Sequence, residues 1–145
     1  MKNFIFISPN FPEVYYKFLI ELKRVGFNVL AITDCPWYEL SNNVKNNCTE
    51  YYYVSSLSDI HQMEEAVKYF LNKYGEISYL ESNNEFWLMQ DAYLREKFNV
   101  TYGLRPIDMD VIKYKSKMKS KFLDAGVKVA RFIIPTDYKQ TIEFI

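Results

Sequence analysis

Polar side chains that could contact a ligand follow two short apolar runs in this 145-residue sequence. The runs cover residues 4–8 and 77–80, and both are typical of strands buried in a parallel sheet. We expect the two strands to be neighbours, because ligands in such sheets bind beyond the carboxyl ends of strands where the strand order reverses. The candidate residues for a substrate-side crevice there are Ser8, Asn10, Glu81, Asn83, Asn84 and Glu85.

The polar residues after the second run also have a purely structural explanation. Residues 81–85 directly precede a predicted helix over 86–98, and Asn and Glu are favoured at helix starts for their capping and charge alone. The sequence therefore leaves both substrate contact and helix capping open at this loop, and it favours capping.

Lysines occupy every second position from residue 113 to residue 121. A lysine ammonium group is a compact charge that can hold a phosphate oxygen through a charge-assisted hydrogen bond. Closely spaced lysines are also typical of a solvated helix face, and the spacing alone singles out none of the five.

Other motifs that would indicate a specific chemistry are missing from the sequence. Residues 8–13 contain no glycine, so a dinucleotide could not approach this loop, although Asp34 stands where a ribose-binding acid would. The sequence has no P-loop and no nucleophile elbow. Cys35, Cys48 and the single His61 are too few for a zinc site or a disulfide framework. We therefore expect no catalytic residue and no metal ligand in this chain.

Short apolar runs alternate with helical patterns through the first hundred residues. The predicted strands cover residues 4–8, 29–33, 51–54 and 77–80, with a fifth over 100–102. This alternation predicts an α/β fold with a Rossmann-like parallel sheet and helices on both faces.

The predicted helices have recognisable ends and apolar stripes. A helix from residue 12 has its stripe at Val14, Phe18, Leu22 and Val25, and Gly26 ends it. A second helix over 60–74 is expected to be capped by Ser58, and a third covers 86–98. Residues 37–47 have no clear period and are predicted to form a loop with at most one helical turn.

The pattern changes after Gly103. Helices are predicted over 107–112 and 115–125, a strand over 129–134, and the start of another helix from residue 138. Residues 142–145 are mainly apolar and carry neither a C-cap nor a glycine. We therefore predict one domain over residues 1–103 and a helical linker with the truncated beginning of a second domain over residues 104–145.

The stretch 113–127, preceded by Gly103-Leu104-Arg105-Pro106, resembles the junction before the nucleotide-binding domain of ATP-grasp enzymes such as biotin carboxylase and the large subunit of carbamoyl phosphate synthetase. In that family a lysine opens the helix, and an Ala-Gly-Val-like turn ends it. The position that matches the family's ATP-contacting lysine is Lys115. The loop over 81–86 is similar to a family loop that faces the active site. One departure is Lys128-Val129-Ala130, where many members have a proline-containing turn.

The resemblance implies the N-terminal, pre-ATP-grasp part of an ATP-dependent carboxylate-amine or carboxylate-thiol ligase. The full-length enzyme would use ATP and Mg²⁺ to convert a small-molecule carboxylate into an acyl phosphate. This chain alone is expected to be inactive and to bind neither cofactor, because the family's second ATP-binding lysine and magnesium ligands would lie beyond residue 145. The alternative is a free-standing Rossmann-like binding or regulatory module without catalysis.

Charge and hydropathy exclude several classes of partner. The 18 basic and 18 acidic residues balance, which disfavours binding to nucleic acid. No apolar run reaches the roughly 18 residues of a membrane span, and no signal-peptide pattern opens the sequence, so we expect a cytoplasmic protein. The sequence leaves a homodimer open.

Overall fold

The computed structural model describes residues 2–145, and the chain divides into two compact units. One unit ends at Pro106 and the other covers Ile107–Ile145. The assignment of residues 1–103 and 104–145 to two domains of a larger enzyme stays a prediction.

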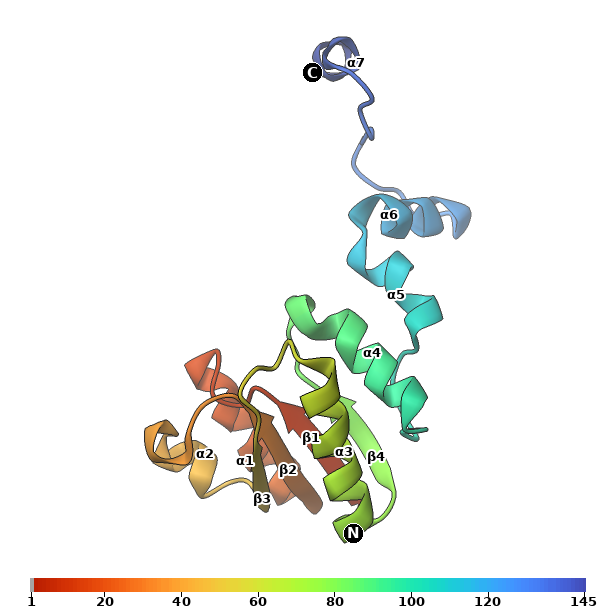
Figure 1. Ribbon diagram of the computed structural model, residues 1–145. Helices are drawn as coiled ribbons and strands as arrows, with labels where there is room; N and C mark the ends of the chain where they lie inside the picture. The colour runs from red at the N-terminus through yellow and green to blue at the C-terminus, as the bar shows by residue number, and fades with distance from the viewer. Residues whose placement is uncertain (1) are drawn as a thin grey trace. The chain divides into compact units, whose positions relative to one another are not determined.

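The first unit is built on a four-stranded sheet with the order β3-β2-β1-β4 (Figure 1). All neighbouring strands are parallel, and Phe6 in the central β1 is paired with Ala31 of β2 and with Glu81 of β4. The strands are β1 Lys2–Ile7, β2 Phe27–Thr33, β3 Glu50–Tyr53 and β4 Ile77–Glu81. The predicted Rossmann-like parallel sheet is confirmed, as is the placement of the first strand beside the fourth.

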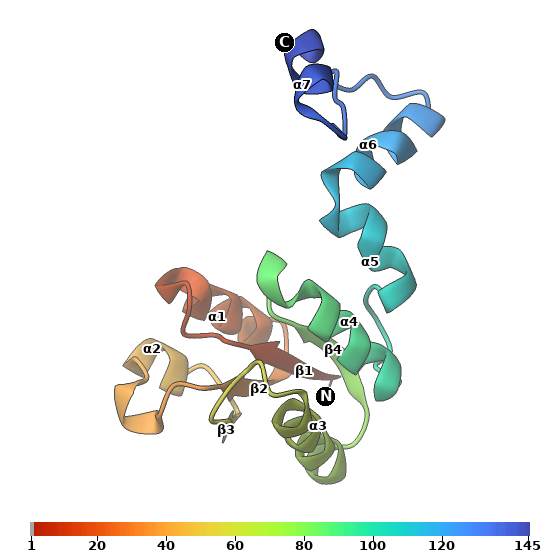
Figure 2. The ribbon, with the colours of Figure 1, turned by 45° about the horizontal axis from the view of Figure 1, so that its top comes forward.

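Helices cover both faces of this sheet (Figure 2). Ile5 and Ile7 of β1 belong to an apolar cluster with the helices of one face, while Phe6 belongs to the cluster of the other. Successive side chains of a strand point to opposite faces, so a strand covered on both sides needs a continuous apolar run. The helices are α1 Tyr16–Arg24 and α2 Asn42–Lys45 on one face, and α3 Ile60–Tyr74 and α4 Leu88–Lys97 on the other.

The long helix α3 begins at a different cap from the predicted one. Asp59, not Ser58, is the N-cap, and its side chain accepts hydrogen bonds from the backbone N–H groups of His61 and Gln62. Gly75 ends the helix with φ 79°, in the left-handed region that favours glycine. His61 lies exposed in the first turn of this helix.

The predicted apolar stripe of the first helix is only partly correct. Leu19 is the fully buried residue of α1, while Val14, Phe18 and Val25 are exposed. The chain first makes a 3₁₀ turn over Glu13–Tyr15. A 3₁₀ turn advances about 120° per residue against about 100° in an α-helix, so a stripe projected from residue 12 is out of phase when α1 starts.

The predicted fifth strand over 100–102 is not a strand, although it lies along the edge of the sheet. The N–H groups of Thr101 and Tyr102 donate to the carbonyls of Ile77 and Ser78 at 3.2 and 3.0 Å. Gly103, with φ 111°, then turns the chain away before a ladder can form. This segment covers part of the exposed edge of β4.

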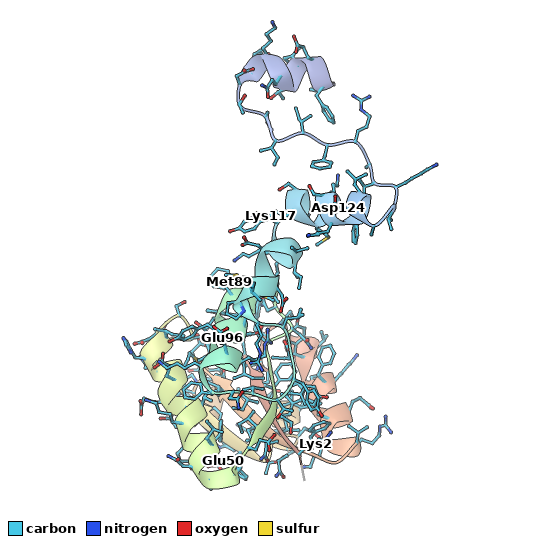
Figure 3. The ribbon with its side chains drawn as sticks, turned by 90° about the vertical axis from the view of Figure 1, so that its right-hand side faces the viewer. Lys2, Glu50, Met89, Glu96, Lys117 and Asp124 are labelled. Carbon is cyan, nitrogen blue, oxygen red and sulfur yellow. The ribbon has the colours of Figure 1, made fainter. Side chains whose placement is uncertain are left out.

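The second unit contains α5 Pro106–Lys113 except for its first residue, together with α6 Lys115–Asp124 and α7 Tyr138–Phe144. Figure 3 draws its side chains, with Lys117 and Asp124 labelled on α6. The strand predicted over 129–134 is wrong, because these residues have no regular structure. A strand exists only where another strand pairs with its backbone groups, and the described residues of this unit include no strand.

Candidate functional site

A pocket of about 470 Å³ lies at the carboxyl ends of the strands. Each of the four loops that follow a strand contributes to its wall. The lining residues are Ser8, Asn10 and Phe11 after β1, Asp34 after β2, Leu57 after β3, and Asn84, Phe86 and Trp87 after β4. The predicted adjacency of the loops at 8–11 and 81–85 is therefore confirmed. Ligand binding there stays a prediction.

The six predicted crevice residues do not all face this pocket. Ser8, Asn10 and Asn84 line it, whereas Glu81, Asn83 and Glu85 are not among its lining residues. Asp34, Leu57, Phe86 and Trp87 also line the pocket, although the sequence pattern does not predict them there. These residues follow different strands and become neighbours only because the strands pair in one sheet. No local sequence pattern identifies them.

Two left-handed residues shape the loops on either side of the pocket. Ser8 has φ 55°, and its backbone donates to the carbonyl of Ile32 at 2.8 Å and accepts from the N–H of Phe11 at 3.3 Å. Asn83 has φ 54°, and its carbonyl accepts a 2.6 Å hydrogen bond from the hydroxyl of Tyr15. Such backbone strain in non-glycine residues is concentrated at functional sites, which motivates a binding hypothesis here.

Asn10 and Asn84 are held in place through their side-chain oxygens. Asn10 Oδ1 accepts from Thr33 Oγ1 at 2.5 Å, which ties the loop after β1 to the end of β2. Asn84 Oδ1 accepts from the N–H of Phe86 at 3.0 Å and so caps the 3₁₀ turn Glu85–Trp87. Capping therefore accounts for the oxygen of Asn84 but leaves its amide nitrogen for another role.

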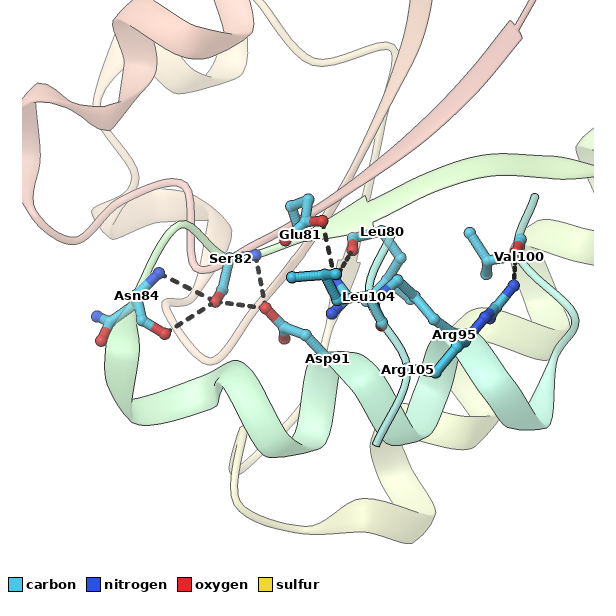
Figure 4. A network of polar contacts seen from close by, with 9 residues as sticks. All are labelled: Leu80, Glu81, Ser82, Asn84, Asp91, Arg95, Val100, Leu104 and Arg105. Atoms are coloured by element: carbon cyan, nitrogen blue, oxygen red, sulfur yellow. Dashed lines mark hydrogen bonds and ion pairs between the residues drawn. The ribbon is translucent and has the colours of Figure 1, made fainter. Parts of the chain in front are cut away.

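Glu81 is engaged by a buried arginine that the sequence did not indicate (Figure 4). The side chain of Arg95 is 1% exposed, and its Nη1 lies 2.8 Å from Glu81 Oε1. The same guanidinium donates to the carbonyls of Leu80 and Leu104 at 2.9 and 2.8 Å. Burial raises the pKa of Glu81, although the Arg95 charge opposes this. Arg95 thus fastens the end of β4 to the segment that leaves the first unit.

Gly103 leaves the space that Arg95 fills. A Cβ atom at this glycine would lie 2.6 Å from Arg95 Cδ, well inside van der Waals contact. Residue 103 has φ 111°, and only a residue without a side chain fits beside the arginine in this conformation. Gly103 and Arg95 therefore form one structural feature, although they are eight residues apart.

A second buried acid, Asp91, supports the loop after β4. Its Oδ2 accepts hydrogen bonds from the N–H and Oγ of Ser82 at 2.9 and 2.6 Å, while its buried Oδ1 has no partner in the described chain. Burial raises the pKa of Asp91 to about 7, against the effect of the Ser82 hydrogen bonds. Asp91 and Arg95 stand four residues apart in α4, but Asp91 binds Ser82 whereas Arg95 binds Glu81, so this spacing does not indicate either contact.

The lysines of the second unit are not equivalent. Lys115 is the first residue of α6 and is exposed. Lys117 forms an ion pair with Asp110, and Lys119 Nζ lies 5.0 Å from the ring centre of Phe132. Because Lys115 opens α6, it stands beside the free backbone N–H groups of a helix N-terminus, which favour anions.

The described residues offer no ready-made metal site. No group of three or more His, Cys, Asp or Glu side chains within residues 2–145 is arranged to hold an ion. Cys35 and Cys48 are free thiols. No helix in this part of the chain is both long and apolar enough to cross a membrane.

Two solved structures resemble this chain over 99% of its length. One is an L-amino acid ligase from Bacillus licheniformis, with 15% sequence identity and a TM-score of 0.64, of which the chain spans 41%. The other is the biotin carboxylase domain of a single-chain bacterial carboxylase, with 15% identity and a TM-score of 0.67, of which it spans 34%. The sequence matches no protein-family model and no curated protein at a significant level. Because both similar structures are ATP-grasp enzymes, the chain has an ATP-grasp-related fold.

Proposed function

We propose that this chain is the N-terminal part of an ATP-dependent ligase that activates a carboxylate as an acyl phosphate and transfers the acyl group to an amine or a thiol. The observation that carries the proposal is the structural likeness, over almost the whole chain, to two ATP-grasp enzymes. The chain spans about two fifths of the first and one third of the second, so the activity would belong to a longer protein. The free thiols favour a reducing, cytoplasmic location.

Lys115 is the residue through which the chain would contact ATP. The exposed ammonium group and the N-terminus of α6 put positive charge in one place, which suits a phosphate. The described residues offer no acidic cluster for Mg²⁺, so the ligands of a bound magnesium ion would come from elsewhere in the enzyme. Magnesium would neutralise charge on the phosphates, while Lys115 would position them.

The affinity for ATP distinguishes this chain from a complete enzyme. One charge-assisted hydrogen bond contributes about 1.5 to 3 kcal/mol, whereas micromolar binding requires about 8 kcal/mol. We therefore expect calorimetry to detect no ATP binding by the 145-residue chain at micromolar concentrations. Micromolar affinity of this chain alone would contradict the proposed division of labour.

The role of Lys115 is tested in a protein that also carries the remaining nucleotide-binding domain. Lys115→Ala should weaken ATP binding or turnover at least about tenfold, the equivalent of one such hydrogen bond. Lys121→Ala is the matched control, because Lys121 is exposed on the same helix, away from its N-terminus. Lys117→Ala is less suitable, since it also breaks the ion pair with Asp110. Equal effects at 115 and 121 would mean that a general basic face had been mistaken for a site.

A second function is a free-standing binding module without catalysis. One observation favours it: every residue that lines the pocket lies within residues 8–87. Such a module would bind its ligand with the same affinity whether or not ATP and Mg²⁺ are present. A ligase would show coupling between the two, which binding measurements with and without MgATP can detect.

A further inference from the structure

We propose that the pocket at the strand ends binds a small primary amine that carries an apolar or aromatic group and a neutral oxygen acceptor. This inference rests on the proposed ligase function, where the bound molecule would be the amine that receives the acyl group. The pocket would therefore hold the acceptor and not the carboxylate that is activated. Three properties of its lining lead to this conclusion.

Charge is the first property. Asp34 is the one charged residue among the eight that line the pocket, and it is exposed there. No lysine, arginine or histidine is part of that lining. The buried Arg95 nearby in the fold already pairs with Glu81 and with two carbonyl groups. A bound carboxylate would thus meet an acid without a compensating cation, whereas an ammonium group would find its counter-charge.

Hydrogen-bond polarity is the second property. The oxygens of Asn10 and Asn84 are occupied by Thr33 Oγ1 and by the N–H of Phe86. Their amide nitrogens have no partner among the residues that the structure describes, so each side chain offers N–H donors to the pocket. Neutral donors of this kind match a carbonyl or hydroxyl oxygen on the ligand. Both side chains are fixed through the opposite end of the amide, which reduces the entropy lost on binding.

Exposed aromatic rings are the third property. Phe86 is 72% exposed and Phe11 66% exposed, and both line the pocket. The rings of Phe86 and Trp87 meet edge to face, with their centres 4.6 Å apart. Large apolar side chains gathered in a concave site are typical of small-molecule pockets. Aromatic faces also attract an organic ammonium ion, which adds to the effect of Asp34.

Three ligands with the same carbon skeleton separate the contribution of the ammonium group from those of the ring and the carbonyl oxygen. L-phenylalaninamide carries the ammonium group, the carbonyl and the ring; 3-phenylpropanamide lacks the ammonium group; 3-phenylpropanoate carries a carboxylate instead. Titrations of the chain at pH 6, below the usual pKa of an α-amino group, would be followed by NMR of the Asn10 and Asn84 side-chain amides and the Trp87 indole. These signals give both the dissociation constant and the location of the bound ligand.

We expect L-phenylalaninamide to bind about fivefold more tightly than 3-phenylpropanamide, the upper range for a solvent-exposed ion pair, and 3-phenylpropanoate to bind most weakly. Asp34→Asn should bring the first two ligands within twofold of each other. Glu39→Gln is the matched control, because it removes one exposed negative charge outside the pocket and should leave the preference intact. If both variants lost the preference for L-phenylalaninamide over 3-phenylpropanamide, the preference would come from the overall charge of the chain. That result would overturn the proposal.

Two other results would also overturn this proposal without affecting the ligase function. One is binding of the carboxylate at least as tightly as the amine, and the other is the absence of shifts at Asn10, Asn84 and Trp87 with all three ligands. Failure of the ligase function with the amine site intact would give a different result. A confirmed amine preference together with an amine affinity that MgATP leaves unchanged in the longer protein would retain the site and refute the ligase.

Discussion

Protonation of Asp91 should make the stability of the first unit depend on pH in an unusual direction. Its pKa rises to about 7 in the folded chain, against about 3.9 for an unfolded aspartate, because the group is buried and Oδ1 has no hydrogen-bond partner. The folded state therefore binds the proton more tightly. The contribution of Asp91 to the free energy of unfolding falls as pH rises from about 4 to about 7, and it is constant outside this range. Between pH 4.5 and pH 8 the loss is about 3 kcal/mol.

Asp91→Asn isolates this contribution, because an amide does not titrate and other groups change equally in both proteins. Urea unfolding followed by circular dichroism at pH 4.5 and pH 8 gives the stability difference between the variant and the natural chain. This difference should shift in favour of the variant by about 3 kcal/mol at the higher pH. Ser82→Ala removes the hydroxyl hydrogen bond, one of the two from Ser82 that lower the pKa of Asp91, so the decline should extend to higher pH. The same stability difference at both pH values would refute this explanation.

The remaining predictions concern the arginine that fastens the end of β4. Arg95→Met should lower the free energy of unfolding by about 3 to 5 kcal/mol, because it leaves the partly buried Glu81 carboxylate without its counter-charge. Urea midpoints would measure this loss, and a change below 1 kcal/mol would contradict it. Gly103→Ala should cost more than Gly126→Ala in the same assay. Both glycines have positive φ, but only at Gly103 would the new methyl group collide with Arg95. Equal losses would mean that backbone strain alone matters.

The sequence was sufficient for the features that depend on neighbouring residues. The apolar run in β1 predicted a strand buried on both faces, since each residue of such a strand meets a helix layer whichever way it points. Gly26 marked the end of α1, because a left-handed residue is needed there. The alternation of such strands and helices was enough to predict the parallel sheet, with its first strand beside its fourth.

Errors occurred where a segment had to find a partner far away in the chain. Residues 129–134 have strand propensity, but propensity does not supply the second strand that satisfies their backbone groups. Residues 100–102 do meet β4, yet Gly103 turns the chain after two hydrogen bonds. In α1 the preceding 3₁₀ turn changed the buried face, and this turn has no distinctive sequence pattern.

Tertiary structure alone decided the composition of the candidate pocket. Ser8, Asn10 and Asn84 were predicted from their positions after two strands, but Asp34, Leu57 and the aromatic pair after Asn84 join them only because all four parallel strands end at one edge. Glu81 is the last residue of β4, three positions before Asn84, yet its carboxylate pairs with Arg95 and does not line the pocket. The local sequence pattern indicates which residues end a strand. The direction of each side chain depends on its hydrogen-bond partners, and only the packed sheet brings these partners within reach.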